Sequence, residues 1–163
     1  MLHPDHVSSE LSAEERLLLD EEHARLERFL VDLRDTCENF SAQGDCFSCS
    51  RAQVATCQGR LNSFNYDFLD LVAAHFENEE TIMLNSLKAA DEDVYFICHR
   101  AEHARLMTEV KDLMRESAVL SRQGNPSEAI RNLERKVAEM FGDHAHVFDV
   151  PFLQITQGAD AGR

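Results

Sequence analysis

The chain of 163 residues is long enough for one domain with a substantial hydrophobic core. Its 16 basic and 30 acidic residues give a formal net charge of −14, which disfavours binding to nucleic acid or to an anionic membrane surface. The sequence contains no apolar stretch of about 18 residues and no signal-peptide pattern, so we expect no membrane-spanning helix and a cytoplasmic location. Five cysteines in such a chain favour thiols or metal ligands over structural disulfides.

The first predicted helix begins near Ser12 and continues to about Phe40. Its start is indicated by the sequence S-A-E-E, in which Ser12 and Glu15 can form a capping box. Residues 1–11 before it are predicted to be a disordered leader. The helix carries a stripe with steps of four and three residues, which consists of Leu19, His23, Leu26, Leu30, Leu33, Cys37 and Phe40.

Three further helices follow a turn-rich segment, SAQGDCFSCS, which predicts a loop with cysteines. The second runs from about Arg51 to Ser86. The third follows the acidic run at 91–93, and the fourth begins with Asn125 as cap and Pro126 in the first helical position. We therefore predict an all-α fold, an up-down-up-down antiparallel four-helix bundle over residues 12–150 with a Cys-containing loop between helices 1 and 2. Pro151 is expected to break the last helix, and residues 151–163 are predicted to be a C-terminal tail or linker.

Polar side chains interrupt the apolar stripes near one end of this predicted bundle. They are His23, His75, Glu79, His99, His103 and His144. Burying so many polar groups without partners would cost on the order of several kcal/mol each, and a metal ion is the partner that would offset this cost. The other three histidines, His3, His6 and His146, lie outside the stripes and are given no role.

The spacing of these residues favours one shared centre. His75 and Glu79, like His99 and His103, are four residues apart and therefore share one helix face. Asp149 follows His144 by five residues, about 140° around an ideal helix, so it must approach from a distorted last turn or slightly from the side. Five imidazoles and two carboxylates are too many ligands for one tetrahedral zinc ion and suit iron or manganese. Two ions bridged by the two carboxylates would use every group.

The order H, HxxxE, HxxxH, HxxxxD, with one element on each helix, resembles the hemerythrin family and in particular the bacterial hemerythrin-like domains. The resemblance implies a non-haem di-iron site in which His99, His103 and His144 hold one iron and His23 and His75 hold the other. Glu79, Asp149 and a solvent-derived oxo or hydroxo group would bridge the pair. Dioxygen would bind at an open position of the second iron, in an apolar pocket that the resemblance places at Leu26, Phe76 and Val147.

Three functions fit these ligands. The favoured one is an oxygen or redox sensor domain of a signalling protein, such as a diguanylate cyclase or a chemoreceptor, because the first two helices are long and the end of the chain resembles a linker to an output domain. The alternative is a stand-alone oxygen carrier or storage protein. An enzyme that reduces dioxygen, peroxide or nitric oxide is less favoured, because five imidazoles with only two carboxylates favour binding over oxidation. The oligomeric state is left open, with a homodimer as one alternative.

The cysteines between His23 and His75 depart from the compact pattern of the family. They are Cys37, Cys46, Cys49 and Cys57, and they are expected to meet at the end of the bundle remote from the irons. Three interpretations stay open: a tetrahedral zinc site, a redox-active CxxC pair, or two core cysteines with an incidental pair in the loop. Cys98 adjoins His99 and is given no role.

Overall fold

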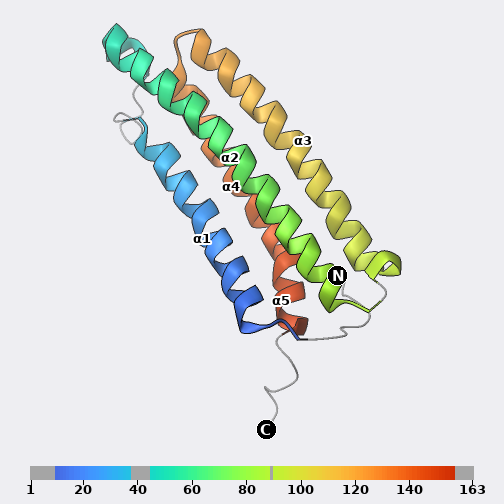
Figure 1. The fold of residues 1–163 in the computed structure, drawn as a ribbon. Coiled ribbons are helices and arrows are strands. Elements are labelled where there is room, and N and C mark those ends of the chain that lie inside the picture. The colour runs from blue at the N-terminus through green and yellow to red at the C-terminus, as the bar shows by residue number, and fades with distance from the viewer. Residues whose placement is uncertain (1–9, 38–44, 89, 157–163) are drawn as a thin grey trace.

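The computed structural model describes residues 10–37, 45–88 and 90–156, and these residues form helices without any strand. Four long helices, α1 (Ala13–Asp35), α2 (Arg51–Ser86), α3 (Val94–Arg122) and α4 (Pro126–His144), pack side by side (Figure 1). A π-helical segment, η4 (Ala145–Asp149), and the short helix α5 (Val150–Thr156) continue from α4. Short 3-10 turns, η2 (Cys46–Ser48) and η3 (Ala90–Glu92), precede α2 and α3. The prediction of an all-α helical bundle is confirmed.

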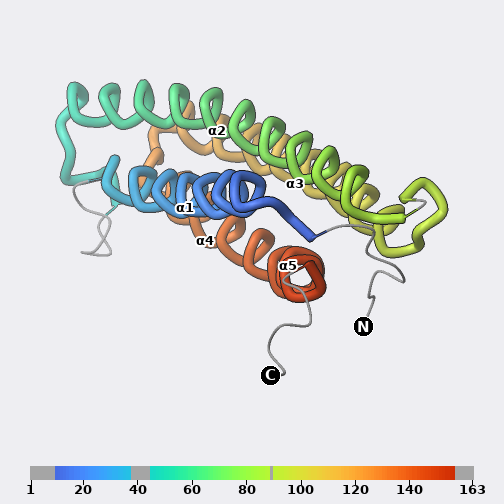
Figure 2. Tube along the Cα trace, turned by 60° about the horizontal axis from the view of Figure 1, so that its bottom comes forward, coloured from blue at the N-terminus to red at the C-terminus, as the bar shows by residue number. Residues whose placement is uncertain are grey.

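The connections between the helices lie at the two ends of the bundle. The end of α1 and the beginning of α2 lie together at one end, and the end of α2 meets the beginning of α3 at the other (Figure 1). The tube in Figure 2 shows α1 beside α4 in one layer and α2 beside α3 in a second layer. Helix α5 lies at the end where α1 begins. None of the described helices is both long enough and apolar enough to cross a membrane.

Side-chain caps begin the helices where the sequence predicts them. Ser12 accepts a hydrogen bond from the backbone N–H of Glu15 at 3.2 Å, and Glu15 accepts one from the N–H of Ser12 at 2.8 Å, so the predicted capping box is confirmed. Asn125 accepts from the N–H of Glu128 at 3.3 Å, and Pro126 is the first residue of α4. These contacts satisfy N–H groups that have no partner within a helix.

Helix α1 ends at Asp35, earlier than the predicted end near Phe40. The hydroxyl of Thr36 donates to the backbone carbonyl of Leu33 at 2.7 Å, and such a bond competes with continuation of the helix. Cys37 therefore lies beyond the helix, although its side chain is still buried. Phe40 lies outside the described residues.

Pro151 does not break the last helix, contrary to the prediction. It is the second residue of α5, where a proline is tolerated because N–H groups in the first turn need no partner within the helix. The next residue, Phe152, has no exposed surface. The segment after Asp149 is thus packed into the bundle as far as Thr156.

Two apolar clusters form the core, and a polar layer separates them. The larger cluster includes Leu26, Val72, Phe76, Leu106 and Val137. The smaller one, next to α5, consists of Leu11, Leu19, Ile82, Met83, Leu87, Ala90, Tyr95, Phe96 and Phe152. On α1, α2 and α3 the predicted ligands fall between a residue of the first cluster and a residue of the second, and His144 and Asp149 fall between Val137 on α4 and Phe152 on α5. The stripes thus place all the polar side chains at one level of the bundle, with apolar packing on both sides.

Candidate metal centre

The polar layer brings together all seven side chains that the sequence predicts as metal ligands. They fall into two groups, one of Glu79, His99, His103 and His144, and one of His23, His75 and Asp149. Within each group, one ligand atom per residue lies within 4.8 Å of the others. Six of the seven side chains are buried, and His23 is intermediate. The two groups divide the histidines as the resemblance implies.

The carboxylate of Glu79 faces imidazoles of both groups. Its Oε2 lies 3.2 Å from Nε2 of His103 and 3.6 Å from Nε2 of His99. The same oxygen lies 4.0 Å from Nε2 of His75, which belongs to the other group. Glu79 is therefore placed between the two sets of nitrogens.

Asp149 also spans the two groups. Its Oδ1 lies 3.1 Å from Nε2 of His144 and 3.3 Å from Nε2 of His99, and its Oδ2 lies 3.4 Å from Nε2 of His23. The π-helical segment η4 makes this approach feasible, because its wider turn brings a residue five positions after His144 back to the same face. The distorted last turn expected from the sequence is confirmed as this π-helix.

Unsatisfied polar atoms test whether these residues fit a metal ion. Eight buried side-chain nitrogen or oxygen atoms of the described residues have no hydrogen-bond partner, and six of them belong to residues of this layer. Four of the six take part in the contacts described above, namely His23 Nε2, Glu79 Oε2, His103 Nε2 and Asp149 Oδ1. The other two, His99 Nδ1 and His144 Nδ1, are on the sides of the rings away from these contacts. In addition, Nε2 of His99 and Nε2 of His144 lie 3.2 Å apart. A cation is the partner that converging imidazole nitrogens and carboxylate oxygens lack, so the donor set fits a metal.

Two further carboxylates, which the sequence analysis missed, support histidines from outside the layer. Oε2 of Glu22 on α1 lies 3.0 Å from Nδ1 of His75 on α2, and Nδ2 of Asn78 donates to Oε1 of Glu22 at 2.6 Å. Oε1 of Glu80 lies 2.9 Å from Nδ1 of His103. A carboxylate at Nδ1 fixes the ring so that Nε2 faces the centre and strengthens it as a donor. In the sequence, Glu22 and Glu80 stand out only because each is next to a predicted ligand. That position does not indicate which histidine on another helix the carboxylate contacts.

Burial keeps three imidazoles in the form that binds metal. It lowers the pKa of His99 to about 4, and it also lowers the pKa values of His75 and His103. At neutral pH these rings are therefore neutral, as metal ligation requires.

The two carboxylates of the layer titrate in opposite directions. Burial, reinforced by the charge of Asp149, raises the pKa of Glu79 well above its ordinary value. Burial alone would raise the pKa of Asp149 too, but the close imidazoles of His144, His23 and His99 outweigh it and hold that pKa well below its usual range. The nearby carboxylate of Asp149 in turn raises the pKa of His23. Without a cation, Glu79 therefore keeps its proton to a higher pH than an ordinary glutamate, and Asp149 stays ionised to a lower pH than an ordinary aspartate.

A cavity of about 290 Å³ adjoins the group of His23, His75 and Asp149. Its walls are mainly apolar and include Leu26, Leu30, Val137, Ala138 and Phe141. Of the three predicted pocket residues, Leu26 lines this cavity. Phe76 instead stacks on the ring of His103 with ring centroids 4.0 Å apart. Val147 is 48% exposed and does not line the cavity.

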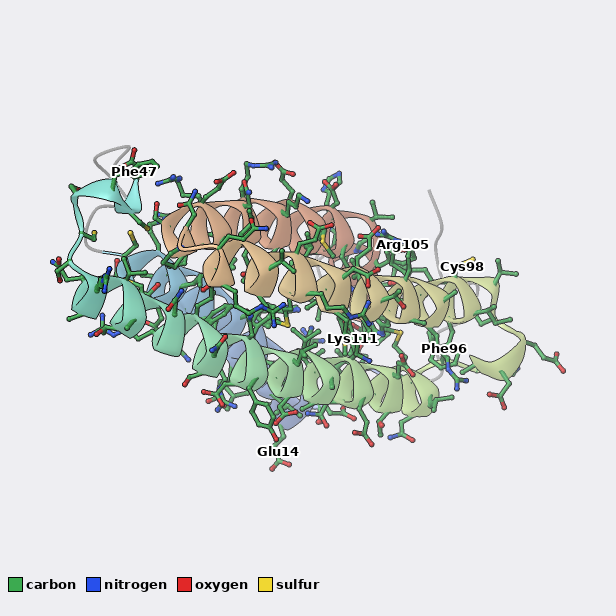
Figure 3. The ribbon with its side chains drawn as sticks, turned by 90° about the horizontal axis from the view of Figure 1, so that it is seen from above. Glu14, Phe47, Phe96, Cys98, Arg105 and Lys111 are labelled. Atoms are coloured by element: carbon green, nitrogen blue, oxygen red, sulfur yellow. The ribbon has the colours of Figure 1, made fainter. Side chains whose placement is uncertain are left out.

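The four cysteines near the α1–α2 connection line a different cavity, of about 260 Å³. In the described part of the chain, the groups whose ligand atoms already converge for metal binding are the two in the polar layer, and neither contains a cysteine. Cys98 lies on α3, toward the opposite end of the bundle from Phe47 (Figure 3).

The comparisons with known proteins agree with this geometry. Residues 17–149 match the sequence model of the hemerythrin family, described as the hemerythrin HHE cation binding domain. No curated protein and no solved structure matches the chain. The family match covers most of the chain and includes every residue of the polar layer. The chain therefore belongs to the hemerythrin family, and its buried layer of histidines and carboxylates is arranged so that it could hold a metal ion.

Proposed function

We propose that the polar layer holds two iron ions and binds dioxygen reversibly. The observation that carries this proposal is that Glu79 and Asp149 each face imidazoles of both groups. Two carboxylates in such positions are suited to bridging two ions, one held by His99, His103 and His144 and the other by His23 and His75. The up-down-up-down arrangement predicted from the sequence is part of this proposal, because it puts all five histidines at one level.

The second group has the features of a ligand-binding side. It contains two histidines instead of three, and the cavity lined by Leu26 lies against it. Bound ferrous ions would supply the electrons that hold dioxygen. The protein contributes neutral imidazoles and an apolar wall, which admits a small neutral molecule and keeps water and anions away from the reduced site.

Five imidazoles with two carboxylates favour binding over oxidation chemistry, so we propose a binding protein rather than an enzyme. We further propose that it acts as an oxygen or redox sensor domain, with a stand-alone carrier as the alternative. A direct path from the site to the C-terminal segment supports sensing. Asp149 is followed at once by α5, in which Phe152 is fully buried and Thr156 accepts a hydrogen bond from Nη2 of Arg16 at 2.7 Å. A shift of Asp149 would therefore move a packed helix at that end of the domain.

An optical titration tests the proposed binding. The reduced, iron-loaded protein is exposed to oxygen and then deoxygenated while iron is counted per chain. We expect two irons and a charge-transfer band that appears with oxygen and disappears on its removal. Rapid, irreversible oxidation would overturn reversible binding and point to a redox sensor or to an enzyme that consumes oxygen or peroxide.

Hydrogen exchange tests the sensor function separately. Backbone amides of α5 are compared in the oxygenated and deoxygenated states, with amides of the middle of α3 as the internal control. We expect oxygen to change exchange in α5 more than in α3. Equal exchange in both states would favour the carrier.

A further inference from the structure

A second cavity of the bundle is surrounded by cysteines. Cys37, Cys46, Cys49 and Cys57 all line a space of about 260 Å³ at the end where α1 meets α2. Cys37 follows α1, Cys46 and Cys49 flank the turn η2, and Cys57 lies in the second turn of α2. Cys57 is about 27 Å along α2 from His75 at 1.5 Å per residue, so the proposed di-iron site does not use these thiols.

The turn η2 directs two of these cysteines to one side. The backbone N–H of Cys49 donates to the carbonyl of Cys46 at 3.1 Å, which closes a single 3-10 turn. Side chains three residues apart in such a turn are eclipsed, so both sulfurs can face the cavity. Phe47, between them, is 94% exposed and lies at the tip of the bundle (Figure 3).

The other two cysteines approach from the helices. Sγ of Cys57 donates to the backbone carbonyl of Thr36 at 3.6 Å, which brings it beside Cys37 at the end of α1. Burial raises the pKa of Cys57, and the charges of Cys37, Cys46 and Cys49 raise it further, while Arg60 on the cavity wall lowers it. All four cysteines line one cavity, so their thiolates would repel one another there, and a divalent cation would offset this repulsion.

From this juxtaposition we propose that Cys37, Cys46, Cys49 and Cys57 bind one thiolate-preferring divalent cation of the zinc type. Four sulfurs around one enclosed space match the tetrahedral set of a closed structural zinc site. A single disulfide would use two of the four, whereas a tetrahedral cation site uses all four. Because the sulfurs do not yet converge as the polar-layer ligands do, binding requires them to turn into the cavity.

The site would tie the end of α1 to the start of α2. Both helices also carry ligands of the polar layer, namely His23 on α1 and His75 and Glu79 on α2. A cation held by the cysteines would fix how these two long helices lie against each other at the far end. It would therefore stabilise the bundle without touching the iron ligands.

Cobalt substitution tests the proposal on the iron-loaded, thiol-reduced chain, so that the polar layer is already filled. Co²⁺ is added without oxygen, and the thiolate-to-cobalt charge-transfer band and the intense bands of tetrahedral cobalt are recorded. We expect one cobalt per chain with both features, displaced by Zn²⁺. The double variant Cys46→Ser, Cys49→Ser should lose them, and the control Cys98→Ser should keep them.

X-ray absorption of the zinc-loaded wild-type chain provides a measurement that needs no variant. Four sulfur neighbours at about 2.3 Å are expected. Absence of a thiolate band, retention of the band in the double variant, its loss in Cys98→Ser, or zinc with nitrogen and oxygen neighbours would each overturn the cysteine site. Iron content and the oxygen-dependent band are read from the same samples, so failure of the di-iron proposal is seen separately.

Discussion

The carboxylate of Glu22 on α1 holds the imidazole of His75 on α2, with 3.0 Å between Oε2 and Nδ1. Asn78 fixes the other carboxylate oxygen by donating to it at 2.6 Å. Glu22 is next to His23 in the sequence. The same turn of α1 therefore places His23 in the group of His23, His75 and Asp149 and also orients His75. This contact couples the α1–α2 interface to the metal centre.

Replacing Glu22 by Gln should therefore weaken metal binding without destroying the fold. The amide keeps the shape of the side chain but removes the negative charge that strengthens His75 as a donor. We expect metal affinity to fall about 10- to 100-fold, as for other partners of metal-binding histidines. Competition with a chelator measures it. The matched control is Glu21→Gln on the exposed face of α1, and equal affinities in the two variants would contradict the role of Glu22.

Glu79→Ala should remove at least one of the two metal ions. Its carboxylate faces His103, His99 and His75 within 4.0 Å, so its loss takes a shared ligand from both groups. Metal analysis of the purified variant gives the count per chain. Glu77→Ala, an exposed position on the same helix, is the control and should retain the full content. A Glu79→Ala chain that keeps two ions would show that this carboxylate is not a bridge.

Metal binding should release a proton from Glu79. Burial and Asp149 raise the pKa of Glu79 well above its ordinary 4.5, so the metal-free protein keeps a proton there to a higher pH than an ordinary glutamate, and a cation must displace that proton. Because Glu79 binds its proton more tightly in the folded chain than in the unfolded chain, protonation stabilises the metal-free fold. This stabilisation is complete below pH 4.5 and is lost as the pH rises through the raised pKa. Metal affinity should accordingly rise with pH over that window. Calorimetry in buffers of different ionisation enthalpy counts the protons, and Glu79→Gln should release fewer than the wild type.

The sequence predicted the ligands well because helical periodicity alone places them. His75 and Glu79 share a helix face, and each lies within an apolar stripe whose neighbours, such as Val72 and Ile82, are buried. The start of α1 at Ser12 could also be predicted from the sequence, because a helix cap depends on only a few adjacent residues. Periodicity and capping chemistry were thus sufficient to predict most of the bundle and six of the seven side chains of the polar layer. Asp149 is the exception, because it lies about 140° from His144 on an ideal helix and reaches the layer through the π-helical segment.

Features that depend on how helices cross were not predictable in this way. Glu22 contacts a histidine 53 positions away, and no spacing within α1 reveals that partner. Val147 was assigned to the pocket by the resemblance to the family, whereas in the structure it lies in the π-helical segment Ala145–Asp149 and is 48% exposed. The same distortion carries the chain into α5, so that Pro151 falls at a helix start rather than an end.

The cavity next to His23 and His75 can be narrowed at Gly142, which lines it from α4. A Cβ atom built at Gly142 meets nothing within 4 Å, so the position has room for the start of a side chain. The substitution should also favour the helix by about 0.5–1 kcal/mol. We expect Gly142→Leu to slow the association of dioxygen while leaving the metal content unchanged, because the larger side chain fills part of the space through which the ligand approaches.

Stopped-flow mixing of the reduced, iron-loaded variant with oxygen measures the association rate in the Gly142→Leu chain. The control is Gly59→Leu, which is equally open but lies on α2 roughly four turns before His75, along a different groove. That control should bind oxygen at the wild-type rate. If both variants match the wild type, the ligand does not enter through the cavity beside Leu26. The route would then have to be sought on the side of the layer where Phe76 stacks on His103 and a separate surface depression lies.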